Sequence, residues 1–314
     1  MELVHGHSRA TAASVTTDAA VVRDHERVES DMDDKTSSDR TSGDELPHPT
    51  VTFAGPGTWQ QSLHVEHVWG TAVVIDLRAP ELPPDVDTLL ADGIAYLHQV
   101  DAWFSTYRAD TPITMYRNGL IELSRTPAVV RDVLTACQWV KTLTEGAFDP
   151  WAVKGGVDPS GYVKGWAAGQ LGDRFVRAGI PNVSINAAGD IACRGLQAPG
   201  EEWAIGILNP YNNQEVVEVV HIGDGAIATS GLYERGNHIK NPRTGTTDVY
   251  YDSATIVGPD AGLADALATA ALLEGPSCAR WFVELPGWSV YLIKNGHASF
   301  FGPAFPRPTS PDLA

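Results

Sequence analysis

Apolar residues recur along the chain with two spacings, one typical of helices and one typical of strands. Residues 84–104 place apolar side chains three or four positions apart, and the same spacing recurs over 129–140 and from about 164 to 178. This period predicts three helices, each with one buried face. Runs typical of strands lie at 64–69, 72–77, 182–191, 203–208, 215–222 and 226–230. The mixture predicts an α+β fold.

The stretch SATIVGPDAGLADALATAALL, residues 253–273, joins a further strand to a fourth helix. Its first five residues alternate and branch as strands do, GPD ends the strand, and the run of Ala and Leu predicts a buried helix. Beyond the first turn, the only polar side chains of that helix are Asp265 and Thr269. Four positions apart, they project from one face. A carboxylate and a hydroxyl there suit a divalent cation such as Mg²⁺. The alternative is that both simply face solvent.

Residues 1–50 carry acids, Ser and Thr with no hydrophobic periodicity, as in SDMDDKTSSDRTSGDELPHP. Such a segment buries too little apolar surface to offset the entropy lost on ordering, so we expect a disordered acidic N-terminal tail. Residues 51–314 are then expected to form one domain, which ends in a hairpin over 288–301. Asn295-Gly296 in that hairpin favours a type I′ turn.

Composition narrows the classes of function. A formal net charge of −17 argues against nucleic acid and anionic membranes as partners, because both need clustered Lys and Arg. Cys137, Cys193 and Cys278 are widely spaced and outside any CxxC, so we expect buried free thiols. No apolar run approaches the roughly 20 residues of a membrane span, and no signal-peptide pattern is present, which favours a cytoplasmic protein.

Three polar stretches lie next to the predicted helices. FSTYR follows the first helix and brings Tyr107 and Arg108, a ring and a guanidinium suited to an aromatic ligand and a phosphate. GAFDP, residues 146–150, closes the second helix with a turn. The stretch 158–166 puts Lys164 near the start of the third helix, where exposed amides favour an anion. Each stretch alone is also typical of an ordinary surface loop or turn.

Three further stretches end in small or polar residues. NAAGDI, residues 186–191, can lie flat beneath a ligand or form a bulge. IATSG, residues 227–231, ends a strand in hydroxyls, and HIKNPRTG, residues 238–245, offers a histidine and a turn that contains proline. A lone histidine such as His238 is more often structural or on the surface than in contact with a ligand.

Taken in this order, the stretches resemble the ApbE family, the FAD:protein FMN transferases. The resemblance runs from about residue 70 to 273 and rests on FSTYR, GAFDP, DPSGYVKGW, IATSG and HIKNPRTG, together with SATIVGPDAGLADALATA. It implies a single T-fold-like domain of mixed, largely antiparallel sheets packed with helices. It also implies an enzyme that binds FAD, uses Mg²⁺ to cleave the pyrophosphate, and transfers FMN to a Thr or Ser hydroxyl of an acceptor protein, releasing AMP.

The functional positions of the family carry over onto this sequence. The resemblance implies metal ligation by the Asp265 and Thr269 side chains and by the Gly161 main-chain carbonyl. The FAD contacts that it implies are Trp69, Tyr107, Arg108, Ala147, Phe148, Asp149, Asp158, Lys164 and His238. Asp265, Thr269 and His238 are the expected catalytic residues, and the general base stays open between His238 and Asp265.

A few positions depart from the family pattern. Trp69 replaces the usual methionine, NAAGDI replaces NVGGDI, and Asn241 replaces an acid in HIKNPRTG. The acceptor protein is expected to carry a motif such as D-x-x-S/T-G-A-S/T, which this chain lacks. Two alternatives stay open. One is a hydrolase that splits FAD to FMN and AMP with water. The other is a flavin-binding protein without turnover, against which the intact Asp265 and Thr269 argue.

Overall fold

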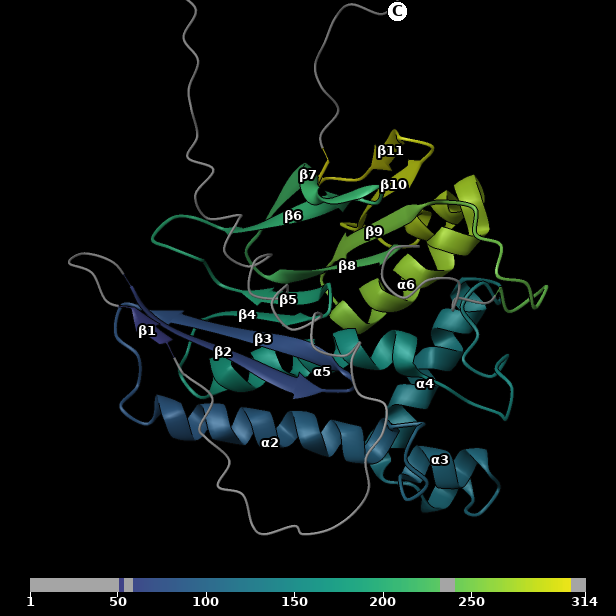
Figure 1. The fold of residues 1–314 in the computed structure, drawn as a ribbon, viewed down its shortest axis with the longest axis horizontal. Coiled ribbons are helices and arrows are strands. Elements are labelled where there is room, and N and C mark those ends of the chain that lie inside the picture. The colour runs from purple at the N-terminus through teal and green to yellow at the C-terminus, as the bar shows by residue number, and fades with distance from the viewer. Residues whose placement is uncertain (1–50, 54–58, 232–240, 306–314) are drawn as a thin grey trace, which may run out of the picture. The chain divides into compact units, whose positions relative to one another are not determined.

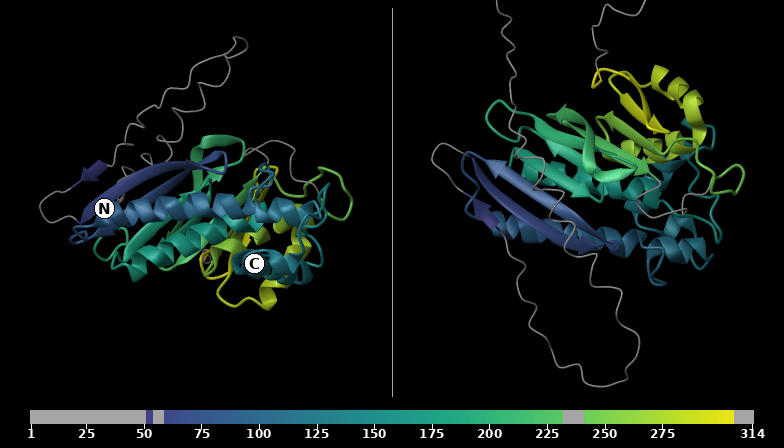
Figure 2. Two further views of the ribbon diagram at one scale, coloured as in Figure 1. Left: turned by 90° about the horizontal axis from the view of Figure 1, so that it is seen from below. Right: turned by 45° about the horizontal axis from the view of Figure 1, so that its top comes forward.

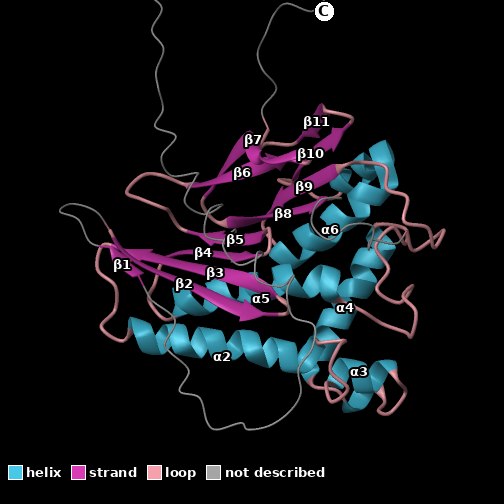
Figure 3. Ribbon diagram, in the orientation of Figure 1, coloured by secondary structure: helices cyan, strands magenta, loops and turns pink. Residues whose placement is uncertain are grey.

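A nine-stranded antiparallel sheet runs through the chain in the order β1-β2-β3-β4-β5-β8-β9-β10-β11, and β6 and β7 form a separate two-stranded ribbon (Figure 1). The computed structural model describes residues 51–53, 59–231 and 241–305, all within one unit, Pro49–Ala314. Helices and strands are both abundant (Figure 3). The α+β fold with largely antiparallel sheets is therefore confirmed.

The strands are β1 (Val51–Phe53), β2 (Gln60–Val68), β3 (Thr71–Ala79), β4 (Asn182–Ala187), β5 (Asp190–Arg194), β6 (Trp203–Asn209), β7 (Asn212–Ile222), β8 (Gly225–Gly231), β9 (Ser253–Gly258), β10 (Ser289–Lys294) and β11 (His297–Phe301). The helices are α2 (Val86–Phe104), α3 (Pro112–Arg117), α4 (Ala128–Leu143), α5 (Ser160–Arg177) and α6 (Ala261–Glu274), with 3₁₀ turns η1 (Leu123–Arg125) and η2 (Gly275–Val283).

Both faces of the sheet are covered, each by its own hydrophobic cluster. Strand alternation in β9 sends Ile256 into the cluster beneath α5 and α6 and Val257 into the cluster that includes Trp203 of β6. On the helical side α5 packs on β4 and β5, α6 packs on β8 and β9, and α2 lies along α5 (Figure 2). Because α6 is buried on nearly every side, Asp265 faces protein rather than water, whereas Thr269 is only partly buried.

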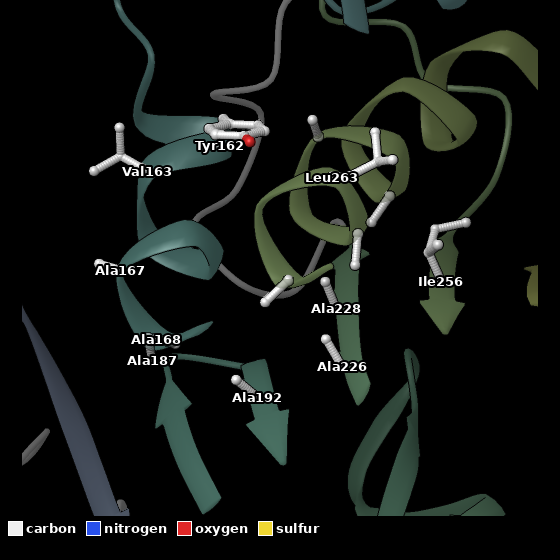
Figure 4. Packing of buried hydrophobic residues seen from close by; sticks show 14 of the residues in the cluster. Tyr162, Val163, Ala167, Ala168, Ala187, Ala192, Ala226, Ala228, Ile256 and Leu263 are labelled. Carbon is white, nitrogen blue, oxygen red and sulfur yellow. The ribbon is translucent and has the colours of Figure 1, made fainter. Parts of the chain in front are cut away.

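The closest packing in the helical layer is between α5 and α6. A Cβ atom on Gly165 would lie 2.1 Å from the main-chain oxygen of Ala261, so only glycine fits there. Gly262 repeats the arrangement from the other helix, since its Cβ would lie 2.9 Å from both Tyr162 and Trp166. Small side chains also line the sheet beneath these helices, including Ala192 of β5 and the alanines of β8 (Figure 4). Because no side chain separates them at Gly165, the two helix backbones lie in direct contact.

Most predicted elements are confirmed, with three differences. The single strand run predicted over 182–191 is two strands, β4 and β5, joined by a turn at Ala188 and Gly189. The third predicted helix begins at Ser160, before the expected start near residue 164, so Lys164 lies inside α5. The polar loop after FSTYR contains a short helix, α3, which Thr111 caps by accepting a 3.2 Å hydrogen bond from the Thr114 amide. Six residues with a proline start carry too little periodicity to reveal this helix.

Several local expectations also hold. Asn295 and Gly296 have φ values of 50° and 78°, as a type I′ turn requires. Cys137, Cys193 and Cys278 are free and buried. Among the described residues, no helix combines the length and apolar character that crossing a bilayer requires. The expected tail over residues 1–50 lies outside the described residues and stays a prediction.

The α5–α6 contact predicts opposite effects for two alanine substitutions on one helix. Gly165→Ala should lower the free energy of unfolding by about 2 kcal/mol or more, because the added methyl group meets backbone. Gly169→Ala, whose Cβ would lie 3.7 Å from the Ala261 Cβ, should be neutral or stabilising by up to about 1 kcal/mol through helix propensity. Urea denaturation of both variants measures the difference. Equal stability of the two would contradict this packing.

Candidate functional site

One ammonium group joins two buried carboxylates where α5, α6 and β5 meet. Lys164 Nζ lies 2.9 Å from Asp190 Oδ2 and 3.0 Å from Asp265 Oδ2. The Gly165 amide, on the same turn of α5, lies 3.4 Å from Asp265 Oδ2. Both acids are almost fully buried, with 4% and 3% of their surface exposed. The close approach at Gly165 places this part of α5 within reach of Asp265.

The charges at this junction do not cancel, since two acids share one base. Burial, followed by the charge of Asp265, raises the pKa of Asp190 to about 7, and Lys164 opposes that rise. The two carboxylates together raise the pKa of Lys164 above its ordinary range, although burial works in the opposite direction. Lys164 is therefore firmly protonated, and the raised pKa of Asp190 shows that one ammonium does not fully balance two carboxylates, so a further cation would favour their ionised form.

Thr269 lies one turn beyond Asp265 on the same face of α6. Its Oγ1 is 3.2 Å from Ser230 Oγ, near the end of β8, so one hydroxyl of IATSG reaches the site from the sheet. Gly161 approaches from α5: a Cβ there would lie 3.8 Å from Thr269 Oγ1 and 3.4 Å from the Phe148 ring. The structure thus brings together the three predicted metal-binding residues, Gly161, Asp265 and Thr269.

The donors at this point fit Mg²⁺ in their chemistry, because carboxylate, hydroxyl and carbonyl oxygens are the ligands that this hard cation prefers. Lys164 and Gly165 both contact Oδ2 of Asp265, which leaves Oδ1 as the oxygen available to a cation. No group of three or more His, Cys, Asp or Glu side chains able to hold a metal occurs in the described part of the chain. A cation here would therefore complete its shell with water or substrate oxygens, as Mg²⁺ commonly does.

The predicted flavin-binding turn, residues 146–149, follows α4 and is fixed by local contacts. The Phe148 amide donates to Thr144 Oγ1 at 3.1 Å, and its ring lies against Gly161. Asp149 accepts from the Trp151 amide at 2.9 Å and pairs with Lys141 at 2.7 Å. This turn therefore lies beside the predicted metal ligands, with its backbone held before any ligand arrives.

Two other predicted FAD contacts, Asp158 and Trp69, differ in whether their polar atoms are paired. Asp158 accepts a 3.0 Å hydrogen bond from the Ser160 amide at the start of α5. Trp69 lies in the β2–β3 turn with a φ of 61°, and its buried indole N–H has no hydrogen-bond partner. A buried donor without a partner is costly in a protein interior, so Trp69 is ready to donate to an added acceptor.

Tyr107 and Arg108 are not part of this cluster. Tyr107 is 96% exposed, and Arg108 is engaged by Asp101 at 3.3 Å and Asp110 at 3.1 Å. His238 lies outside the described residues. Their roles stay predictions.

Sequence reasoning missed two residues of the site. Asp190 was considered only as part of the small-residue stretch NAAGDI, and Ser230 only as the end of a strand. Both are identified by strand pairing: β5 pairs with β8, so their ends lie together under α5 and α6. A charged residue directly after a glycine turn, at the start of a buried strand, was the available signal for Asp190.

Comparison with known proteins decides the family. The ApbE family model matches residues 152–292, a range that includes Asp158, Gly161, Lys164, Asp265 and Thr269. An FAD:protein FMN transferase of Salmonella typhimurium is 28% identical over 162 residues, and one of Vibrio cholerae serotype O1 is 38% identical over 98 residues. These matches support assignment of the chain to the ApbE family. These two alignments span 46% and 29% of the respective relatives and 48% and 28% of this chain.

Solved ApbE structures share the fold over a larger part of the chain. The flavin transferase ApbE from Vibrio cholerae superposes with a TM-score of 0.68 at 23% identity, covering 78% of this chain and 97% of that one. The apo form of the Pseudomonas stutzeri flavinyl transferase ApbE gives a TM-score of 0.66 at 18% identity, covering 78% of this chain and 95% of that one. The fold described above is therefore the ApbE fold.

The shared ammonium predicts an asymmetry between two substitutions in this ApbE site. Lys164→Met should lower the free energy of unfolding by about 2 to 4 kcal/mol, because it leaves two buried acids without their counter-ion. Asp265→Asn leaves one acid for one base and should change stability by about 1 kcal/mol or less. Urea denaturation at neutral pH measures both variants. A Lys164→Met protein as stable as the wild type would show that the ammonium is not the required counter-ion.

Proposed function

We propose that this protein is an FAD:protein FMN transferase, which moves FMN from FAD to a Thr or Ser hydroxyl of an acceptor protein and releases AMP in an Mg²⁺-dependent reaction. The observation that carries the proposal is the meeting of Gly161, Asp265 and Thr269 beside the turn of Phe148. The names of the two matched relatives support the same activity.

Asp265, Thr269 and the Gly161 carbonyl would hold the cation. Bound there, Mg²⁺ would neutralise charge on the pyrophosphate as its anhydride bond breaks. Phosphoryl transfer needs alignment and charge neutralisation more than a covalent enzyme intermediate, and this site provides buried oxygen donors rather than a nucleophile. The three cysteines are buried, and burial raises the pKa of Cys137, near Asp265, to about 12, so none is a reactive thiolate.

Lys164 has two roles in this proposal. Its ammonium carries three N–H donors, of which two point to Asp190 and Asp265. The third remains for a phosphate oxygen, and about a quarter of the side chain is exposed. Lys164 would therefore both fix Asp265 and contact the FAD pyrophosphate.

The turn from Ala147 to Asp149 would hold the flavin side of FAD together with Asp158, and Trp69 would cover the ring with its buried N–H available to an acceptor atom. Asp265 would be a poor general base, because its Oδ2 already binds the Lys164 ammonium and its Oδ1 would bind the proposed cation. That leaves His238 as the base that we propose. The acceptor motif D-x-x-S/T-G-A-S/T and the cytoplasmic location stay predictions alongside it.

The reaction is tested with FAD, Mg²⁺ and an acceptor protein that carries an exposed Thr in this motif. The expected result is a fluorescent flavin adduct that survives a denaturing gel, together with AMP in a one-to-one ratio. Asp265→Asn should lower the rate at least about a hundredfold, the scale of losing one transition-state charge contact, and should abolish Mg²⁺ binding in calorimetry. Asp173→Asn is the matched control: it is the same chemical change at a partly exposed position of α5, where Asp173 pairs with Arg194, and it should keep both the reaction rate and Mg²⁺ binding.

Release of free FMN and AMP at one rate with and without acceptor, and without an adduct, would instead establish the hydrolase. Tight FAD binding with no product would establish a flavin-binding protein. Full activity of Asp265→Asn would show that the metal ligands are misassigned.

A further inference from the structure

Arg243 reaches from its own turn to the backbone that precedes the predicted flavin-binding residues. The turn over 241–246 is closed by a 2.8 Å hydrogen bond from the Asn241 amide to the Thr246 carbonyl. Within it, the Arg243 amide donates to Asn241 Oδ1 at 3.0 Å. The turn is therefore stabilised by its own hydrogen bonds. The guanidinium of Arg243 extends from it toward residues 144 and 145.

The guanidinium donates hydrogen bonds to two main-chain carbonyls there. Nη2 donates to the carbonyls of Thr144 and Glu145, both at 3.0 Å, and Nε donates to the Glu145 carbonyl at 3.2 Å. These carbonyls belong to the last turn of a helix end, where no intrahelical donor is available. A planar guanidinium with several fixed donors suits this double contact better than an ammonium would.

The segment that carries these two carbonyls has an uncommon backbone conformation. The Gly146 amide bonds to the Lys141 carbonyl at 2.8 Å and the Glu145 amide to the Thr142 carbonyl at 3.2 Å, which together form the Schellman motif that ends α4. Glycine usually occupies the left-handed position of this motif, but here it is Glu145, with a φ of 52°. A non-glycine residue there costs on the order of 1 kcal/mol, so contacts outside the helix must hold the turn.

The side chains of the same segment join a second set of contacts. Arg243 Nη1 pairs with Glu274 at 2.6 Å, and Glu274 is the last residue of α6, the helix that carries Asp265 and Thr269. Arg280 pairs with Glu145 at 3.1 Å and with Glu274 at 2.8 Å. The two arginines differ in their main-chain contacts: Arg243 binds the carbonyls of Thr144 and Glu145, whereas Arg280 binds the carbonyl of Ser277 and reaches the turn only through the Glu145 carboxylate.

The turn that Arg243 holds leads directly into the site. The Ala147 amide bonds to the Thr144 carbonyl at 3.0 Å, the same oxygen that Arg243 contacts. The Phe148 amide bonds to Thr144 Oγ1, and the Phe148 ring lies against Gly161. One guanidinium therefore links the end of α6 to the backbone that sets the position of Phe148.

We propose that Arg243 is a positioning residue, which fixes residues 146–149 against α6 in the geometry that binds FAD. This inference rests on the proposed function, because it assigns Arg243 to the flavin-binding step of that reaction. Arg243 needs no contact with FAD for this role. Its loss should weaken FAD binding and leave the metal-binding face of α6 in place.

The test compares Arg243→Gln with Arg280→Gln as the matched control. FAD binding is measured by quenching of flavin fluorescence, Mn²⁺ binding by calorimetry without FAD, and amide hydrogen exchange over residues 144–150 by mass spectrometry. Arg243→Gln should raise the Kd for FAD at least tenfold and speed exchange in that segment, with Mn²⁺ affinity changed less than twofold. Arg280→Gln should change the Kd for FAD less than twofold. Arg243→Lys, which keeps the ion pair and one donor, should fall between.

Equal FAD affinity of Arg243→Gln and the wild type would overturn this inference while leaving the transferase intact. Equal weakening in both glutamine variants would also overturn it, because the ion pairs rather than the carbonyl contacts would then hold the turn. A wild-type protein that does not bind FAD would instead defeat the proposed function itself.

Discussion

The close approach of α5 to α6 at Gly165 is the constraint on which the site depends. With no side chain between Gly165 and the Ala261 carbonyl, the α5 backbone lies near enough to α6 for Lys164 to reach Asp265 and for Gly161 to reach Thr269. A wider separation would leave the two acids without their shared base, and burying them would then be prohibitively costly. The composition of α6, Ala and Leu almost throughout, follows from the same requirement.

The sheet contributes as much to the site as the helices do. β5 begins with Asp190 and Ser230 is the penultimate residue of β8, and the pairing of these two strands places both residues beneath the helix contact. Strand alternation keeps the other side chains of these strands in the hydrophobic clusters on the two faces. The polar centre is thus embedded in apolar surroundings, which strengthen each electrostatic contact in it.

Local patterns in the sequence were sufficient for the parts of the site that lie within one element. Asp265 and Thr269 share a helix face because they are four positions apart, and the structure bears out the burial of that helix. Asp190 and Arg243 could not be found this way. Asp190 meets Lys164 from 26 positions away, through the packing of α5 on β5, and Arg243 meets Thr144 from 99 positions away. No spacing rule encodes such contacts, since they depend on how whole elements pack.

The same distinction between local patterns and long-range packing applies to the prediction of the fold. The helical period in 84–104 and 129–140 was enough to predict α2 and α4, and Asn295-Gly296 was enough to predict a hairpin. The early start of α5 was missed because Ser160 and Gly161 are weak helix formers, and the packing of Tyr162 and Val163 into the core outweighs their propensity.

Lys164 gives the protein a counter-ion of its own. In proteins whose buried acids are balanced by a metal alone, removing the metal removes the fold as well. Here an ammonium on a neighbouring helix already binds both Asp190 and Asp265, so the scaffold does not depend on a divalent ion for its integrity. A divalent ion bound at Asp265, as proposed above, would therefore be an exchangeable part of the reaction rather than a permanent part of the architecture.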